Sequence, residues 1–163
     1  MKTFMEMAKQ RLSQRYVNDI AEQDTLEALL EMSGGQRMEL LKWVMKDKKN
    51  GFLAPRKQAG LEFVKNAPDE GWGILEQLIR SDNPDDRETA CEILEEFRDP
   101  KSYQLIKMLL DDEYPSLQFD ACDFLSDIFS QDVIRTLTGL TQHENKIVRE
   151  AAEKRLELME GKE

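Results

Sequence analysis

Hydrophobic positions recur along this chain with a period of 31 residues. One column of the repeat holds small residues, namely Ala59, Ala90, Ala121 and Ala152. A second column, four positions later, holds large apolar residues, namely Phe63, Leu94, Leu125 and Leu156. Apolar positions at steps of three and four residues match the period of an amphipathic helix. The pattern therefore predicts helices over 53–63, 84–94, 115–125 and 146–156.

A further set of apolar columns precedes each of these segments in the same register. The first column is Leu41, Trp72, Tyr103 and Ile134, and the second is Val44, Leu75, Ile106 and Leu137. The third is Leu78, Leu109 and Leu140, and Asp47 interrupts it in the first repeat. Pro84 and Pro115 stand where the second helix of a repeat would begin, a position that tolerates proline because no amide donor is needed there. Each repeat is thus predicted to be two helices joined by a short polar turn.

The first 35 residues follow a different pattern. Phe4, Ala8, Leu12 and Tyr16 form a stripe at four-residue spacing, and Ser33, Gly34 and Gly35 are typical of a turn. Repeat arrays need an atypical terminal unit with a polar outer face. We therefore predict one domain over 1–163, with a helical cap at 1–35 and four repeats of about 31 residues at 38–160.

The second-helix pattern resembles the HEAT repeat, particularly the short variety of phycobilisome-lyase-like proteins. The best match is the segment 148–156, VREAAEKRL. The resemblance implies an all-α fold, a right-handed α-solenoid of about four helix pairs. It also implies a ladder of acidic turn residues and arginines, with Asp82 matching Arg87 and Glu144 matching Arg149. Gln118 and Gly51 interrupt that ladder. Such scaffolds host many unrelated functions, so the resemblance alone does not define one.

Composition bears on the cellular location of the protein. The chain has 163 residues, of which 40% are hydrophobic and 34% charged. No run approaches the roughly 20 apolar residues of a membrane helix. The N-terminus lacks the apolar run of a signal peptide, and two cysteines do not make a secreted disulfide framework. We therefore expect a cytoplasmic protein without a membrane segment.

Charge is distributed unevenly and bears on the partner. Residues 1–65 contain 12 basic and 9 acidic residues, whereas residues 66–163 contain 11 basic and 24 acidic ones. An acidic field repels a phosphate backbone and attracts a basic protein, so nucleic acid is not the expected partner. The alternative is that the acidic helices serve solubility only. A small basic cluster, Lys46, Lys48, Lys49, Arg56 and Lys57, is interpreted as a solvated surface, and the alternative is a contact with an acidic ligand.

Catalytic, metal and cofactor sites are not predicted. His143 is the only histidine, which is too few for the usual zinc or iron ligand sets, and we expect it in a solvated turn. Gly34-Gly35 and Gly71-Trp72-Gly73 are too short for a phosphate-binding loop. No pairing of a nucleophile with a general base can be argued, because the one histidine is expected in a turn.

Cys91 and Cys122 occupy equivalent positions one repeat apart. They are interpreted as small buried core residues, because stacked helices lie about 8–10 Å apart, too far for an easy disulfide. The alternative is a redox pair or an attachment point, as in phycobilin lyases that carry this repeat. A second enzymatic alternative is a DNA-repair protein like the HEAT-like alkylpurine glycosylases, which need a basic groove.

An acidic stripe is the strongest candidate for a binding surface. Glu88, Glu92 and Glu96 are spaced by four and so share one helix face. The equivalent positions of the next two repeats are Phe119, Asp123, Asp127 and Glu150. In HEAT-like solenoids the second helices line the concave side, which would make this stripe an acidic groove with Phe119 as an apolar anchor. The alternative is an ordinary solvated helix face.

These observations favour a non-enzymatic module that binds a basic protein. A concrete version is an immunity protein that neutralises a basic toxin, or a comparable inhibitor, since opposite charges accelerate association. The alternatives are an enzyme of the lyase or DNA-repair type, or a structural subunit of a larger complex.

Overall fold

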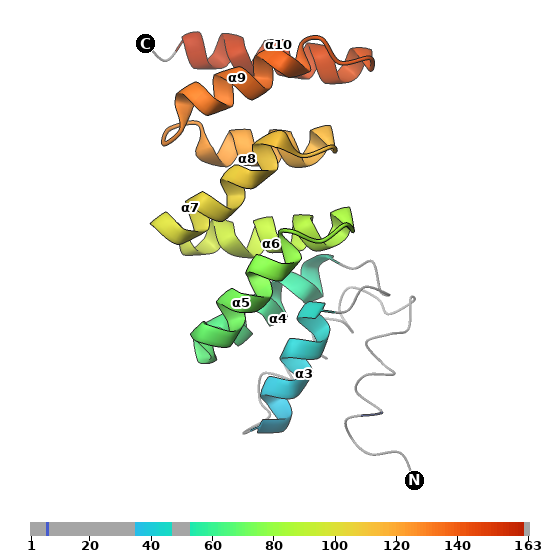
Figure 1. Cartoon of the computed structure of the whole chain (residues 1–163), viewed down its shortest axis with the longest axis vertical. Coiled ribbons are helices and arrows are strands. Elements are labelled where there is room, and N and C mark those ends of the chain that lie inside the picture. Colours follow the sequence, from blue (N-terminus) through green and yellow to red (C-terminus); the bar gives the residue numbers. More distant parts are fainter. Residues whose placement is uncertain (1–5, 7–34, 47–52, 162–163) are drawn as a thin grey trace. The chain divides into compact units, whose positions relative to one another are not determined.

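Every regular element in the described part of the chain is a helix. The computed structural model describes residues 6, 35–46 and 53–161 (Figure 1). The all-α class predicted from the repeat is confirmed within these ranges. The right-handed sense and the count of four repeats stay predictions. Most of the predicted cap at 1–35 lies outside the described residues.

The chain divides into two compact units. Unit 1, Met1–Ile93, holds α3 (Gly35–Lys46), α4 (Leu53–Asn66), α5 (Pro68–Leu78) and most of α6 (Pro84–Phe97). Unit 2, Leu94–Glu163, holds the end of α6, then α7 (Pro100–Ile106), the 3₁₀ helix η1 (Lys107–Asp111), α8 (Pro115–Leu125), α9 (Ser130–Leu140) and α10 (Lys146–Glu160). The single domain over 1–163 stays a prediction.

Helix starts follow the proline positions. The helices α5, α6, α7 and α8 each begin at a proline, at Pro68, Pro84, Pro100 and Pro115 respectively. The starts predicted at Pro84 and Pro115 are therefore confirmed. Asp99 caps α7, since its carboxylate accepts a hydrogen bond from the Ser102 amide at 2.8 Å and the Ser102 hydroxyl accepts one from the Asp99 amide at 3.0 Å. Such reciprocal caps satisfy amides that lack an intrahelical partner.

The repeat columns form the core. Ala59, Ala90, Ala121 and Ala152 are all fully buried, as are the large side chains Phe63, Leu94 and Leu125. Val44, Leu75, Ile106 and Leu137 are also buried. Leu156 is half-buried, although its column predicts a core position. The small column lets neighbouring helices approach, and the large columns fill the space between them.

One of the apolar columns of the first helices lies at the edge of the core. Leu41 is buried, but Trp72 and Tyr103 are half-buried and Ile134 is 37% exposed. This column stands three residues before the buried column of Val44 and Leu75, which places it about 60° around the helix. The buried stripe of these helices is therefore narrower than the apolar stripe in the sequence.

Within unit 1, a buried ion pair joins α4 to α6. Arg56 Nη2 lies 2.6 Å from Asp86 Oδ1, and the two side chains are 5% and 0% exposed. Arg56 Nε also donates to the Met45 carbonyl at 3.2 Å, and the Ser81 hydroxyl donates to Asp86 Oδ2 at 2.8 Å. Arg56 is therefore not part of a solvated basic surface, which corrects the interpretation of that cluster. Lys48 and Lys49 lie outside the described residues.

Arg87, Gln118 and Arg149 occupy the position of Arg56 in the three following repeats, and their side chains anchor the turns. Arg87 donates to the Ser81 carbonyl at 2.8 Å, and Gln118 donates to the Leu110 carbonyl at 3.1 Å. Arg149 donates to the carbonyls of His143 and Glu144 at 2.7 and 2.8 Å. Arg149 thus meets Glu144 through the main chain, whereas the predicted ladder placed an acidic side chain there. These contacts satisfy main-chain acceptors at the turn between the paired helices.

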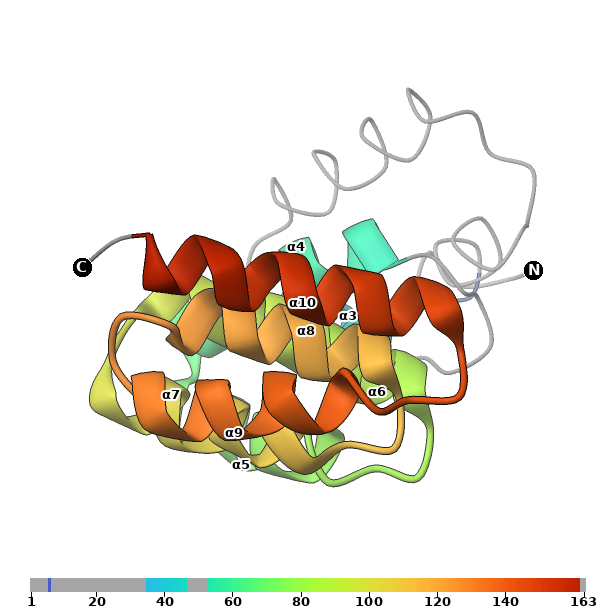
Figure 2. The same ribbon diagram turned by 90° about the horizontal axis from the view of Figure 1, so that it is seen from above.

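Unit 2 is built of two helix layers. In Figures 1 and 2, α8 and α10 lie side by side in one layer, and α7, η1 and α9 lie in the other. Helix α9 contacts α10, α8 and η1. No described helix has the length and apolar character needed to cross a bilayer.

Two glycines of α5 give a test of helix packing in unit 1. A Cβ at Gly71 would lie 2.7 Å from the Cα of Val64, which is α4 main chain, whereas a Cβ at Gly73 would meet nothing within 4 Å. We expect Gly71→Ala to lower the free energy of unfolding by about 1–3 kcal/mol, because backbone must move. Gly73→Ala should raise it by up to about 1 kcal/mol through helix propensity. Urea titrations followed by circular dichroism measure both, and an equal effect of the two changes would contradict this packing.

Candidate functional site

All seven residues of the predicted acidic stripe lie in described ranges. In unit 1, Glu88 and Glu92 lie one turn apart on α6 and are half-buried. In unit 2, the exposed members are Glu96 on α6, Asp123 on α8, Asp127 just after α8 and Glu150 on α10, and Phe119 on α8 is half-buried. The stripe itself stays a prediction.

Arg155 of α10 brings two stripe residues of α8 together. Its Nε lies 2.9 Å from Asp123 Oδ1 and its Nη2 lies 3.0 Å from Asp123 Oδ2, a bidentate pair. The Arg155 guanidinium also lies over the Phe119 ring, 4.3 Å from the ring centroid. A planar guanidinium suits both contacts, one in its plane and one on its face. Phe119 and Asp123 thus help join α8 to α10, and one face of the ring is covered.

The same cluster shifts nearby pKa values. The hydrogen bonding of the Arg155 guanidinium to the Asp123 carboxylate is the main reason that the pKa of Arg155 is raised. Desolvation raises the pKa of the Asp120 carboxyl above its ordinary value, and the Asp123 charge adds to this. Arg155 escaped the sequence-based prediction because it lies 32 residues after Asp123, one position beyond the repeat register. The only sign of this contact in the sequence is that Arg155 is a cation on a helix whose neighbours carry acidic residues at their stripe positions.

The remaining exposed carboxylates of unit 2 are less constrained. Glu150 lies 3.3 Å from Lys146 one turn earlier on α10, and both side chains are well exposed. Such pairs hold weakly in water. Asp127 forms no hydrogen bond or ion pair with any described residue of the chain. These two carboxylates are therefore available to a cationic ligand.

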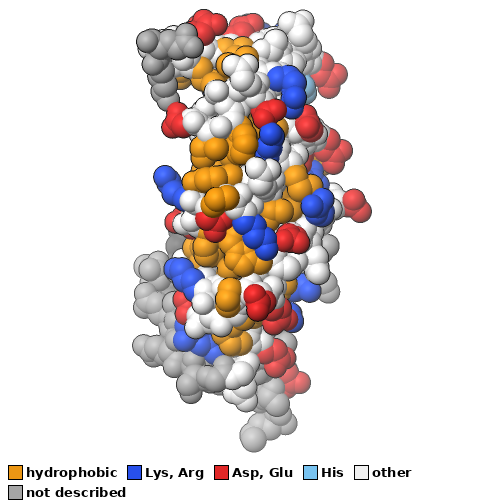
Figure 3. Space-filling view, turned by 60° about the vertical axis from the view of Figure 1, so that its left-hand side comes forward, with side chains coloured by type: hydrophobic (Ala, Val, Ile, Leu, Met, Phe, Trp, Pro, Cys, Tyr) orange, Lys and Arg blue, Asp and Glu red, His pale blue; other side chains and the backbone are white. Residues whose placement is uncertain are grey.

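Exposed hydrophobic side chains add an apolar component to unit 2. Among the described residues, the large hydrophobic side chains with more than a third of their surface exposed all belong to this unit: Met108, Tyr114, Ile128, Ile134, Ile147 and Leu158. Figure 3 shows hydrophobic side chains at the surface with acidic and basic side chains beside them. Apolar surface mixed with charge is common at protein-binding sites.

A second cation–aromatic cluster ties η1 to α9. Lys107 Nζ lies 2.6 Å from Asp132 Oδ2 and 4.6 Å from the centroid of the Phe129 ring. The hydrogen bond from Lys107 lowers the pKa of the Asp132 carboxyl. All three groups are engaged with one another, so we assign this cluster a structural role in unit 2.

His143 serves the turn before α10. Its Nδ1 accepts a hydrogen bond from the Asn145 amide at 3.0 Å, and the Asn145 side chain accepts one from the Ile147 amide at 2.9 Å. His143 is half-buried, so the expected turn position is confirmed but full solvation is not. Within the described ranges, no group of three or more His, Cys, Asp or Glu residues is placed to hold a metal ion.

Both cysteines are buried, and neither is in a disulfide. Cys91 is 2% exposed and Cys122 is 1% exposed, which confirms the core interpretation. Burial raises the pKa of the Cys122 thiol to about 12, and the neighbouring Asp123 charge adds to the shift. A thiol that stays protonated near neutral pH is a poor nucleophile. The lyase alternative, which requires an accessible thiolate, is therefore disfavoured.

Thiol labelling tests this conclusion. We expect Cys91 and Cys122 in the folded protein to react with iodoacetamide at pH 8 at least about 100-fold more slowly than in urea, since reaction requires local opening. Gln131→Cys, at an exposed position on α9, supplies a fast-reacting positive control. Intact-mass spectrometry over time gives the rates, and fast labelling of either native cysteine would restore the lyase alternative.

The chain belongs to the HEAT-repeat family. Residues 73–157, just over half of the chain, match the family described as HEAT repeats. HEAT repeats generally mediate protein–protein interactions or serve as scaffolds, and the family is typically non-enzymatic. No curated protein matches this chain.

Proposed function

We propose that this protein is a non-catalytic interaction module that binds a basic protein through acidic side chains of its second helices. The observation that carries the proposal is the surface shared by α8 and α10 in unit 2. Asp120, Asp123, Asp127, Glu150, Glu153 and Glu157 are all exposed on or next to these two helices. A surface of one charge sign steers an oppositely charged partner and suppresses other encounters.

The stripe works as a field and not as a set of separate ion pairs. Asp123 is already paired with Arg155, so we assign it a supporting role that holds α8 against α10. Glu96 and Glu150 of the stripe, with Glu153 and Glu157 on the same α10, are the exposed carboxylates that we expect to attract the partner, whereas Glu88 and Glu92 are half-buried. An inhibitor that neutralises a basic toxin is the specific version that this charge favours, and its cytoplasmic location stays a prediction.

A pull-down from host lysate with mass-spectrometric identification tests the proposal. The stripe variant carries Glu96→Gln, Glu150→Gln, Glu153→Gln and Glu157→Gln, all at exposed positions of unit 2, which leaves Asp123 and its contacts intact. The control variant carries Asp69→Asn, Asp82→Asn, Asp111→Asn and Glu144→Gln, all exposed and away from the second-helix stripe. Both variants lose the same charge, so a difference between them reports position.

We expect a basic protein to be captured by the unmodified chain and by the control variant, with at least about tenfold less captured by the stripe variant. Equal capture by all three chains would contradict the stripe as the binding surface. Recovery of nucleic acid alone would contradict the protein-binding role and revive the DNA-repair alternative.

A further inference from the structure

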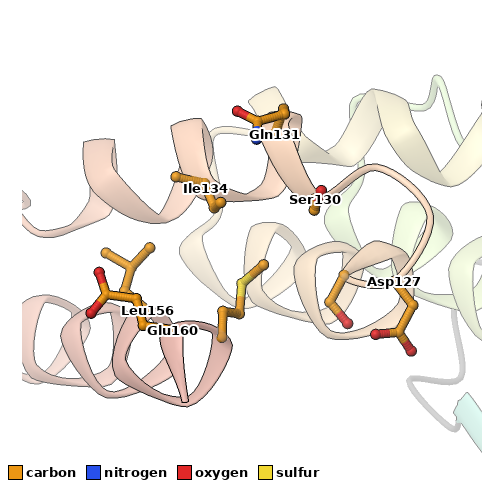
Figure 4. A pocket seen from close by; sticks show the side chains of 8 residues that line it. Asp127, Ser130, Gln131, Ile134, Leu156 and Glu160 are labelled. Atoms are coloured by element: carbon orange, nitrogen blue, oxygen red, sulfur yellow. The ribbon is translucent and has the colours of Figure 1, made fainter. Parts of the chain in front are cut away.

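A pocket opens in unit 2 between the turn after α8, the start of α9 and the end of α10. Its volume is about 290 Å³. The turn contributes Ser126 and Asp127, α9 contributes Ser130, Gln131 and Ile134, and α10 contributes Leu156, Met159 and Glu160 (Figure 4). The volume is enough to receive one large side chain of a partner.

The pocket is apolar on the sides formed by α9 and α10. Ile134 is 37% exposed, and Leu156 and Met159 are half-buried. Leu156 occupies a column that is filled by core residues in the other repeats, and Ile134 a column that is buried only at Leu41, and both line the pocket. A second hollow of about 240 Å³ adjoins it through Ser126 and Met159 and is lined by Val133, Leu137 and Leu158 among others. Covering this surface would release water from apolar groups.

Carboxylates stand at two sides of the same pocket. Figure 4 shows Asp127 at one end of the pocket and Glu160 at the other, with Leu156 beside Glu160. Both residues are exposed, and neither pairs with a described residue of the chain. Unit 2 as a whole contains 16 acidic and 9 basic residues over 94–163. The pocket therefore combines an apolar lining, two unpaired negative charges and an acidic background field.

We propose that this pocket receives an apolar side chain from a polypeptide segment that carries lysine or arginine on both sides of it. The apolar side chain packs against Ile134, Leu156 and Met159, and the flanking cations lie next to Asp127 and Glu160. The aliphatic stems of lysine and arginine pack on apolar surface while their charges remain in water, which suits such a rim. The inference rests on the proposed function for the positive charge of the partner and adds the apolar anchor.

Binding of a defined peptide tests the pocket without the natural partner. The probe is acetyl-Lys-Lys-Leu-Lys-Lys-amide, compared with acetyl-Lys-Lys-Ser-Lys-Lys-amide, which keeps the charge and lacks the apolar side chain. Two-dimensional ¹H–¹⁵N NMR of the full chain reports which amides shift. We expect the leucine peptide to shift amides of Ser130, Gln131 and Ile134, and to bind at least about fivefold more tightly than the serine peptide.

Matched variants separate the pocket from the rest of the surface. Ile134→Lys should weaken binding of the leucine peptide at least about tenfold, whereas Ile147→Lys, at a 75% exposed position of α10, should change it less than about threefold. Asp127→Asn and Glu160→Gln should each weaken binding about two- to fivefold, and Glu153→Gln should not. Unchanged circular dichroism shows that each variant is folded.

Several outcomes would overturn the inference. These are absence of amide shifts at millimolar peptide, equal binding of the two peptides, or shifts away from the pocket. If sedimentation shows that the chain self-associates and Ile134→Lys abolishes this, a second copy fills the pocket and the basic occupant is wrong. The two proposals fail separately. If the four-glutamine stripe variant still captures the partner, the stripe is wrong as the binding surface. If the same variant still binds the leucine peptide, the pocket is supported whatever the result for the stripe.

Discussion

Asp86→Ala is expected to lower the free energy of unfolding by about 3–5 kcal/mol, because it leaves the buried guanidinium of Arg56 without its counter-charge. The two side chains are almost fully buried, and their atoms lie 2.6 Å apart. Asp86 also accepts the hydrogen bond from Ser81, so the hydroxyl loses its acceptor in the same variant. Urea denaturation followed by circular dichroism measures the change.

Two further variants show whether the cost comes from the uncompensated charge. Arg56→Met combined with Asp86→Leu removes both charges and should recover most of the loss, to within about 1–2 kcal/mol of the unmodified chain. Lys146→Ala breaks the exposed pair with Glu150 and should cost less than about 0.5 kcal/mol. A small effect of Asp86→Ala, similar to that of Lys146→Ala, would show that the pair is solvated.

Leu125→Ala is the second large effect that we expect, at about 2–5 kcal/mol of unfolding free energy. The Leu125 side chain is fully buried in unit 2, where α8 packs against η1 and α9. Removing its methyl groups leaves a cavity that the surrounding helices fill only in part. The same change at Leu156, one repeat later and half-buried, should cost less than about 2 kcal/mol.

This comparison tests the repeat register against the structure. Leu125 and Leu156 occupy the same column, so the sequence alone predicts equal effects. The structure predicts unequal ones because Leu156 lines the pocket. Thermal unfolding of Leu125→Ala and Leu156→Ala measures the two effects, and we expect the larger loss of stability for Leu125→Ala. Equal destabilisation would mean that the pocket is closed in solution.

The helical elements were predictable because every 31-residue repeat places small and large apolar residues at the same helix positions. Each alanine in the column must admit a neighbouring helix, so Ala59, Ala90 and Ala121 are buried for one shared reason. Helix starts were predictable where proline marks them, as at Pro84. Local chemistry and a periodic core therefore suffice to predict the fold class.

Contacts between residues far apart in sequence were not predictable. Arg56 has lysines near it in sequence and was therefore interpreted as a surface cation. In the structure it is buried and pairs with Asp86, which is 30 residues away in the sequence. Arg155 pairs with Asp123 across 32 residues, at an offset that the repeat register does not indicate. Both depend on the direction in which a long side chain points, which hydrophobic periodicity does not encode.

The pocket was missed for a related reason. Ile134 and Leu156 carry the apolar residues that the repeat demands, and the same residue types are buried elsewhere in the chain. Whether a column is covered depends on the helices packed around it in space. Asp127 was identified as a member of the acidic stripe, but its place at the rim of an apolar pocket needed the structure.

The central claim is that an acidic surface of this HEAT-repeat chain attracts a basic protein. Its most direct test is the association rate constant of the captured partner, measured by surface plasmon resonance as the salt concentration is raised. We predict a fall of about tenfold or more between low and physiological salt, and a much smaller fall for the stripe variant than for the control variant. An association rate that does not change with salt would contradict the claim.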